Sequence, residues 1–388
     1  MKPVRVAILA NREDSFVRPM AEGLERMVTR AGGVPVLLRD GLEALSRLGD
    51  QNIRTELRRL IREVPSERRF LNRVRDCNVI VVVDSTPRPF LRGVWQVEEL
   101  RRLLPDKPIV LYDLFYLPTR VSWPRWIREG NPAKGLPPGG FGLERFDWYL
   151  CASVVSEIGF PAEPQPCSLI GVDLDDLTLW PSRKREFRAL IDFEHGPDAE
   201  ERAIQIQACE QTGTPHTALQ GHYRIEEIRE IYRQTSLYFL ARRESFGLPI
   251  CELQACGSYV LAPYSAWAPS HGLKTDLGLS GPGQLSPNFI VYGNDFDQLK
   301  REIERIKASH DPQRVFETFL RFHPQLFRGD VPQLARFLRQ IASGEIHSER
   351  HREHPALRRP LEASELSESD PAPSPAMRPP GAPDGRGE

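Results

Sequence analysis

The stretch RRESFGLPICELQACGSYVLAP, residues 242–263, contains a proline and a glycine that indicate where a helix begins and ends, followed by an apolar run. Pro249 suits the first position of a helix, because its missing N–H would have no partner there and its φ is already helical. Gly257 suits the position just past a helix end, which often needs a left-handed backbone. We therefore expect a short helix over residues 249–256 and a buried strand over residues 259–262.

The rest of the chain alternates apolar strands with helices. The other expected strands lie at residues 4–10, 34–38, 79–83, 108–112, 148–151, 188–193, 216–218 and 237–240. The other expected helices lie at residues 16–30, 199–211, 225–233, 296–308, 315–322 and 331–341, with Arg-rich helical segments between 52 and 75. Fully apolar strands that alternate with helices are typical of parallel sheets covered on both faces. The sequence therefore predicts an α/β protein with two doubly wound, Rossmann-like domains, residues 1–175 and 176–342, and an interdomain cleft.

Composition excludes several classes of protein. The chain has 388 residues, which is long enough for two domains, and its formal net charge of -1 gives no bulk attraction to nucleic acid, so we expect no nucleic-acid partner. Its six cysteines show no CxxC pair and no Cys/His spacing of a metal site, so we expect neither a metal nor another cofactor. The apolar run at residues 4–10 is too short for a signal peptide, and no run of eighteen apolar residues occurs. We expect a cytoplasmic protein.

The C-terminal segment differs in composition from the rest. Residues 343–388 are rich in Pro, Ser, Gly and charged residues and contain few large apolar side chains. Such a segment cannot bury enough surface to offset its ordering entropy. We expect a disordered tail.

Two motifs carry a resemblance to a known family. SLYFLARRESFGLPICELQACGSYVLAP, residues 236–263, resembles the donor-binding motif of the retaining, GT-B fold glycosyltransferases of the glycosyl transferases group 1 family. The likeness lies in two glutamates separated by seven residues, with Phe-Gly-Leu-Pro between them and Ala-Cys-Gly after them. GVDLDDLTLWP, residues 171–181, is similar to the family's interdomain segment.

The resemblance implies a role for each part of the first motif. Glu244 would hold hydroxyls of the transferred sugar and act in catalysis, and Glu252 would hold the ribose. Backbone N–H groups around Phe246, Gly247 and Leu248 would meet sugar and phosphate. Elementary chemistry agrees, because a helix start attracts anions and a carboxylate accepts strong hydrogen bonds from hydroxyl groups. Two plainer readings stay open: Glu252 as an acid favoured by the helix dipole, and Glu244 as an ordinary charge at the sheet rim.

The chain departs from the family where an Arg and a Lys usually neutralise the donor diphosphate. The corresponding stretch, LIDFEHGPDAEERAIQ, residues 190–205, offers His195 and Arg202 instead. Arg242, beside the motif, is a further candidate for this task. In the first domain, Asp113 follows the expected strand 108–112, where the family often places a His or Asp near the reacting sugar. An Asp at this point is also a common turn residue.

Two further segments have more than one interpretation. Arginines are frequent over residues 54–75, which suits contact with a membrane surface or a phosphorylated acceptor, but interspersed glutamates favour a solvated helix face. Residues 123–141 form an aromatic, Gly/Pro-rich stretch that suits a lid or an acceptor loop.

The resemblance implies a retaining, metal-independent hexosyltransferase. Its partners would be a nucleotide-sugar donor and an acceptor hydroxyl on a glycan, a lipid-linked sugar or a small molecule. One alternative is a non-catalytic member that binds a nucleotide sugar or a glycan. The other is a sugar-nucleotide epimerase of the same fold.

Overall fold

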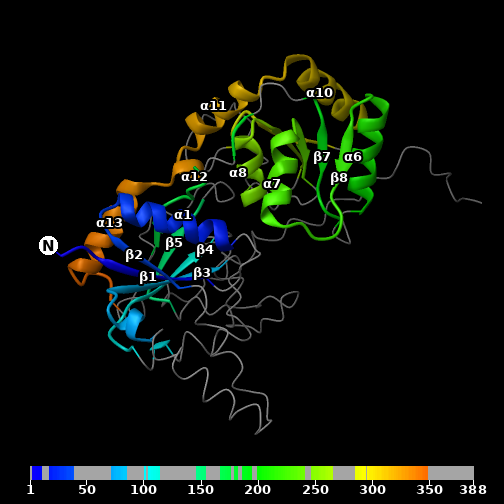
Figure 1. The fold of residues 1–388 in the computed structure, drawn as a ribbon. Coiled ribbons are helices and arrows are strands. Elements are labelled where there is room, and N and C mark those ends of the chain that lie inside the picture. The colour runs from blue at the N-terminus through cyan, green and yellow to red at the C-terminus, as the bar shows by residue number, and fades with distance from the viewer. Residues whose placement is uncertain are drawn as a thin grey trace, which may run out of the picture.

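The computed structural model describes a set of ranges that together form two lobes. The described residues are 2–10, 17–38, 71–84, 100–101, 104–113, 146–153, 167–175, 179–181, 186–194, 199–240, 246–264, 285–293 and 295–347. Figure 1 shows one lobe built on the first half of the chain and one on the second.

The first lobe contains a parallel sheet. Within the described residues its six strands follow the order β2-β1-β3-β4-β5-β6. They are β1 (Arg5–Ala10), β2 (Val34–Leu38), β3 (Val79–Asp84), β4 (Ile109–Asp113), β5 (Trp148–Cys151) and β6 (Cys167–Leu169). Because these strands are almost wholly apolar, both faces of the sheet must be covered. Helix α1 (Val17–Arg30) packs on β1 and β2 through its apolar stripe.

The second lobe contains another parallel sheet. Five described strands follow the order β11-β10-β9-β7-β8. They are β7 (Ala189–Ile191), β8 (His216–Ala218), β9 (Leu237–Phe239), β10 (Tyr259–Pro263) and β11 (Phe289–Tyr292). Its helices are α6 (Ala199–Gln211), α7 (Ile225–Gln234), α8 (Leu248–Ala255), α10 (Phe296–Ser309) and α11 (Pro312–Phe322). The predicted α/β class with two doubly wound sheets is confirmed.

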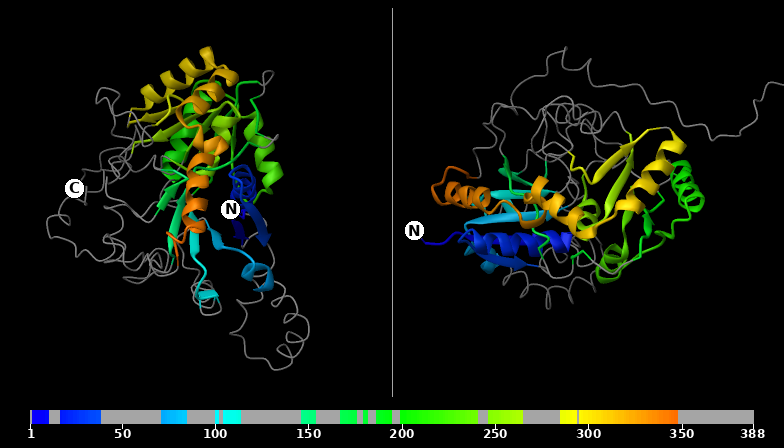
Figure 2. Two further views of the ribbon diagram at one scale, coloured as in Figure 1. Left: turned by 90° about the vertical axis from the view of Figure 1, so that its left-hand side faces the viewer. Right: turned by 90° about the horizontal axis from the view of Figure 1, so that it is seen from above.

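The chain returns to the first lobe at its end. After α12 (Gln325–Arg328), helix α13 (Val331–Ala342) packs against α1 and β6, and Figures 1 and 2 show it beside the first sheet. We expect residues 331–342 as part of the second domain, whereas in the structure α13 packs on the first sheet. The sequence of an amphipathic helix shows which face is apolar, but it does not indicate which sheet that face will cover.

The two segments that connect the lobes are hydrogen-bonded to each other. The N–H of Val172 donates to the carbonyl of Gln325, and the N–H of Leu174 donates to that of Phe327, both at 2.8 Å. In the other direction the N–H of Gly329 donates to the carbonyl of Val172 at 2.9 Å. The two connections therefore form one tie between the lobes.

The described C-terminal end extends past the predicted tail boundary. Ile346 is 3% exposed and belongs to the main apolar core, and its N–H donates to the carbonyl of Gln340. The boundary at Ser343 is therefore too early, because one buried isoleucine follows the last turn of α13. The rest of the predicted tail lies outside the described residues.

Candidate functional site

The motif helix α8 begins one residue earlier than predicted. Gly247 is its N-cap with an extended backbone (φ -179°), and Pro249 is the second helical residue. The sequence suggests Pro249 as the first helical residue, but proline fits the second position equally well, because the N–H there also lacks an intrahelical partner. The helix start follows β9 and lies at the carboxyl edge of the second sheet, where ligands bind in sheets of this kind.

The end of α8 has the predicted glycine. Gly257 has φ +82°, its N–H donates to the carbonyl of Gln254, and the N–H of Ser258 donates to that of Leu253. This pair of bonds is a Schellman motif, which closes the helix and turns the chain into β10. A Cβ at Gly257 would also collide with the backbone of Pro312, so the position requires glycine for two reasons.

The side chains at the start of α8 are directed into the protein. Phe246 is 8% exposed and Leu248 is 3% exposed, and both belong to the main core. What this turn can offer a ligand is therefore its backbone N–H groups. The backbone role that the resemblance implies for Phe246, Gly247 and Leu248 stays a prediction.

Glu252 is a buried carboxylate paired with an arginine of the neighbouring helix. Arg229 of α7 donates to Oε1 of Glu252 from Nε at 3.1 Å and from Nη2 at 2.8 Å. The two side chains are only 7% and 11% exposed, for Glu252 and Arg229 respectively. The helix dipole favours acidic residues in the first turn of a helix. Glu252 is the fifth residue of α8 and therefore lies beyond that turn. The dipole explanation of this glutamate is thereby removed.

The surroundings of Glu252 are shielded from solvent. Burial raises the pKa of Tyr232 well above its ordinary value, and the nearby carboxylate of Glu252 adds to the rise. Burial likewise raises the pKa of Cys251, with Glu252 as the second cause. A hydroxyl or a hydrogen-bond donor placed here would interact with Glu252 at low dielectric, where such bonds are strongest.

Arg202 is engaged inside the second lobe. Its Nε donates to the carbonyl of Asp192 at 3.1 Å, its Nη2 donates to the carbonyl of Leu219 at 2.9 Å, and its Nη1 lies 3.4 Å from Oε2 of Glu194. The side chain is 9% exposed. Arg202 thus joins the segments that follow β7 and β8, which is a structural use of the guanidinium. Its expected contact with a diphosphate stays a prediction.

On the first sheet, Asp113 is the last residue of β4. The register pairs it with Asp84 of β3 on one side and with Cys151 of β5 on the other. Two aspartates therefore end adjacent strands at the same edge. Asp84 is not among the predicted site residues. It directly follows the apolar run VIVVV, and the same pattern identified Asp113.

Several predicted site residues lie outside the described residues. They are Glu244, Arg242 and His195, together with the stretch 123–141 and most of the basic segment 54–75. Of the candidates, the structure therefore brings together the turn 246–248 and Glu252. It adds Arg229, which sequence reasoning missed because its partner is 23 residues away in the chain and on another helix.

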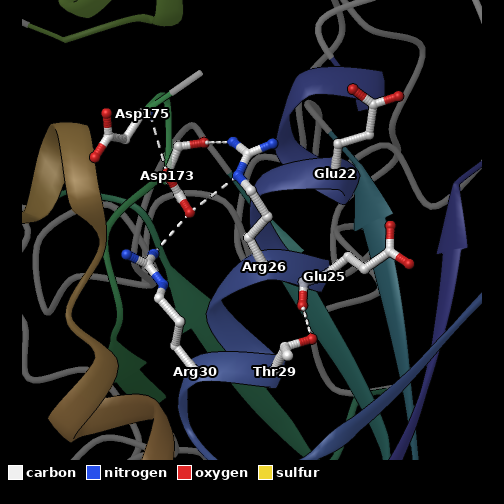
Figure 3. A pocket seen from close by; sticks show the side chains of 7 residues that line it. All are labelled: Glu22, Glu25, Arg26, Thr29, Arg30, Asp173 and Asp175. Atoms are coloured by element: carbon white, nitrogen blue, oxygen red, sulfur yellow. Dashed lines mark hydrogen bonds and ion pairs between the residues drawn. The ribbon is translucent and has the colours of Figure 1, made fainter. Parts of the chain in front are cut away.

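The segment that leaves the first sheet is held by α1. Figure 3 shows Arg26 and Arg30 of α1 converging on Asp173, whose side chain is 2% exposed. Asp175 lies beside them and pairs with Arg328 at 3.3 Å. The pocket at this point has a volume of about 600 Å³ and is lined by Glu22, Glu25, Arg26, Thr29, Arg30, Asp173 and Asp175. Because its charged groups pair mainly with each other and with the connecting segments, the pocket belongs to the tie between the lobes.

Elements of the two lobes also meet between α1 and α7. Nη1 of Arg18 lies 3.6 Å from Oε1 of Glu226. Both side chains are well exposed, so this ion pair contributes little to stability. It nevertheless shows that the helix that carries Arg229 faces the first lobe.

The described residues contain neither a cluster of metal ligands nor a membrane-spanning helix. Within the described ranges, no group of three or more His, Cys, Asp and Glu residues is placed to hold a metal ion. Among the described helices, none has the length and apolar character needed to cross a membrane.

Comparison with known proteins gives a likeness of fold. No family model matches the sequence, and neither does any curated protein. The catalytic domain of starch synthase IV from Arabidopsis thaliana, bound to ADP and acarbose, matches with a TM-score of 0.53 and 11% identity over 88% of this chain and 100% of that one. An α-glucosyltransferase in complex with UDP and a 13-mer DNA containing an HMU base matches with a TM-score of 0.51 and 12% identity, over the same shares of the two chains.

The fold is that of the GT-B glycosyltransferases, as the motif resemblance implied. At 11 to 12% identity the likeness establishes the fold and leaves the activity open. A UDP-N-acetylglucosamine 2-epimerase from Rickettsia bellii matches only with a TM-score of 0.41, at 10% identity over 88% of this chain and 96% of that one, so it does not help to choose between transfer and epimerisation.

Proposed function

We propose that the protein is a glycosyltransferase that moves a hexose from a nucleotide-sugar donor to an acceptor hydroxyl. One observation carries the proposal. At the carboxyl edge of the second sheet, a helix start with an extended Gly247 cap stands one turn before a buried carboxylate, Glu252. The helix start suits a diphosphate and the carboxylate suits a sugar hydroxyl, so the pair fits the order of groups in a nucleotide sugar.

The proposal assigns a task to each part of the site. Glu252 holds the ribose, and the backbone N–H groups at Gly247 and Leu248 meet the diphosphate. Glu244, just before the turn, holds hydroxyls of the transferred hexose, and Asp113 lies at the edge of the first sheet, on the acceptor side. His195 and Arg242 are the cations proposed beside the diphosphate, in place of the usual Arg and Lys.

The proposed chemistry retains the anomeric configuration and needs no metal. The acceptor hydroxyl attacks on the face that the diphosphate leaves, and a departing phosphate oxygen takes up the proton of that hydroxyl. The N–H groups at the start of α8 stabilise the charge that grows on the leaving diphosphate, which is the role of an oxyanion hole.

The fold neighbours support the class of donor and widen the class of acceptor. Their complexes contain UDP and ADP, together with acarbose in one and a DNA 13-mer in the other. Nucleic acid therefore joins glycans, lipid-linked sugars and small molecules as an acceptor class to test, although the net charge of -1 gave no reason to expect it.

A second candidate function is donor binding without turnover. The observation that favours it is Arg202, the arginine of the expected diphosphate region, whose donors are engaged with Asp192, Leu219 and Glu194. A site with weak cationic assistance can bind a nucleotide sugar and still fail to stabilise the leaving diphosphate.

The test is a thermal-shift screen with nucleotide sugars that differ in base and hexose. A ligand at about 100 times its Kd adds roughly 2.7 kcal/mol of stability, which a melting curve resolves. The donor that stabilises the protein is then incubated with acceptors of each class, and nucleoside diphosphate release and product configuration are measured by NMR. Transfer with retention supports the proposal. Binding without release identifies a binding protein, and inversion at C2 identifies an epimerase. A screen without any stabilising nucleotide sugar contradicts all three.

A further inference from the structure

We propose that Arg229 is a positioning residue of the donor site, which holds the Glu252 carboxylate in the orientation that receives the ribose hydroxyls. This inference rests on the proposed function and deepens it. Arg229 lies outside the motif stretch, residues 236–263. It is the contact between α7 and α8 that identifies the residue.

The geometry of the pair suits positioning better than simple attraction. Arg229 approaches Oε1 of Glu252 with two donors, Nε at 3.1 Å and Nη2 at 2.8 Å. Since the guanidinium is rigid and planar, two donors on one oxygen fix the place of that oxygen. A lysine would supply the charge through one flexible ammonium group and would hold that oxygen less closely.

Burial explains why the carboxylate needs this partner. The Glu252 side chain is 7% exposed, and an ionised carboxylate at that depth is costly unless a cation and hydrogen bonds compensate it. Two described neighbours are Tyr232 on α7 and Cys251 on α8, and burial raises the pKa of both, so neither supplies a charge. Arg229 is therefore the cation among these neighbours.

The same pairing matters for an anionic donor. A lone carboxylate beside the diphosphate would repel it, whereas the Arg229–Glu252 pair has no net charge. This is useful in a chain that lacks the Arg and Lys usually found beside the diphosphate. The pair thus anchors the ribose without weakening the attraction of the helix start for phosphate.

The pair also lies on the side of the second lobe that faces the first. Hydrogen bonding to Glu22 raises the pKa of Arg18 on α1, and the positive charge of Arg229 opposes that rise. Glu226, one turn before Arg229 on α7, lies 3.6 Å from Arg18. This is the face on which a ligand between the lobes would be bound.

The experiment compares a nucleoside diphosphate with its 2′-deoxy form. The base is that of the nucleotide sugar that stabilises the wild-type protein, and affinities are measured by calorimetry. If Glu252 holds the ribose, wild type should prefer the ribose form by about 10- to 100-fold, the value of one hydrogen bond to a charged group. In Arg229→Met the affinities for the ribose and deoxyribose forms should differ by less than about threefold. The affinity for the 2′-deoxy form should hardly change, because that ligand lacks the hydroxyl that Glu252 would bind.

Three further variants sharpen the test. Arg229→Lys keeps the charge and loses the two-donor fork, so an intermediate preference is expected, and this variant decides the matter if Arg229→Met does not fold. Glu252→Gln should also lower the preference for ribose. Adding Arg229→Met to Glu252→Gln should cause no further loss of that preference. Arg224→Met is the matched control, because Arg224 is an exposed arginine of the same α7 region that pairs with Glu227, and it should leave the preference unchanged.

The outcomes separate this inference from the proposed function. If wild type binds and Arg229→Met and Arg229→Lys keep the full preference for ribose, Arg229 is a structural partner only and the inference is wrong. An equal loss for both ligands also overturns it and assigns Arg229 to the diphosphate instead. If wild type binds no nucleoside diphosphate at all, the proposed function has failed and the inference falls with it.

Discussion

Arg30 places its Nη2 atom 2.7 Å from Oδ2 of Asp173, and thereby ties the first helix of the chain to the segment that leaves the first sheet. Arg26 joins the same carboxylate oxygen through Nε at 3.2 Å and also donates from Nη2 to the carbonyl of Asp173 at 2.7 Å. The aspartate of the Gly-Val-Asp motif therefore has a mechanical role in this chain. It fixes the point at which the lobes are connected.

Replacing Asp173 by Asn should lower the free energy of unfolding by about 1 to 3 kcal/mol, because two arginines lose their common charged partner at a buried position. Urea denaturation measures the loss. The control is Asp175→Asn, whose more exposed ion pair with Arg328 should be worth less than about 0.5 kcal/mol. Equal effects of the two substitutions would contradict the role given to Asp173.

Gly171→Ala should destabilise the protein far more than Gly221→Ala. The two glycines have nearly the same backbone, with φ of +71° and +70°, so each alanine incurs a similar left-handed cost of about 1 to 2 kcal/mol. A Cβ at Gly171 would also overlap the carbonyl of Gln325 in the other connection, whereas nothing lies near Gly221. We expect a difference of at least about 2 kcal/mol in thermal unfolding. Indistinguishable melting curves would show that the two connections can separate without cost.

His323 should make the protein sensitive to acid. Burial lowers the pKa of His323 to about 4, below its ordinary value of 6.5. The folded state thus favours the neutral ring. This contribution is complete above pH 6.5, declines as the pH falls toward 4, and amounts to about 3 kcal/mol across that window.

The variant His323→Leu should lack that part of the acid-induced loss, and His222→Gln, which changes an exposed histidine, should retain it. Chemical denaturation at pH 7 and at pH 4.5 measures both. If the stability of wild type and that of His323→Leu fall equally between pH 7 and pH 4.5, His323 is not a buried neutral histidine.

Truncation should distinguish the last core residue from the segment after it. Deleting residues 348–388 should leave Tm nearly unchanged, because that segment contains few large apolar side chains. Deleting residues 343–388 removes Ile346 as well, which is buried, and should cost about 1.5 to 3 kcal/mol. The prediction is wrong if the shorter deletion already lowers Tm by several degrees.

Glu244→Gln should impair turnover and spare the binding of bare nucleoside diphosphate. The change keeps the shape and one acceptor oxygen but removes the charge that meets the transferred sugar. Contacts that strengthen as the glycosidic bond breaks act on kcat and kcat/KM together, so we expect both to fall roughly 10- to 1,000-fold. Should nucleoside diphosphate binding fall instead, with turnover at saturating donor intact, the tasks of Glu244 and Glu252 are exchanged.

The part of the fold that the sequence predicted is the part with local signals. The strand-helix-strand unit of β9, α8 and β10 was predicted to within one or two residues at each boundary, because Pro249 and Gly257 mark the helix ends and the flanking runs are apolar. The strands β6 and β11 were not predicted. β6 is only three residues long. β11 is the apolar run FIVY after the Gly/Pro/Ser-rich residues 281–288, so a local signal for this strand was present and was overlooked.

Relationships between distant parts of the chain had no such signals. The arginine at position 229 reads as one of several charges on an exposed helix, and only the packing of α7 against α8 brings it to Glu252. The same holds for α13, whose apolar stripe fits either sheet. The motif residues of the proposed donor site could therefore be predicted from the sequence. Arg229, the partner of Glu252, could be found only from the tertiary structure.

The position of α13 has a consequence for how the protein is made. Its side chains Leu334, Phe337, Leu338 and Ile341 are part of the core that also contains α1. The lobe that is synthesised first therefore stays incomplete until α13 has left the ribosome, and the second lobe emerges before it. During that interval the groove along α1 and β6 exposes apolar surface, which is the kind of surface that chaperones recognise and that leads to aggregation of nascent chains.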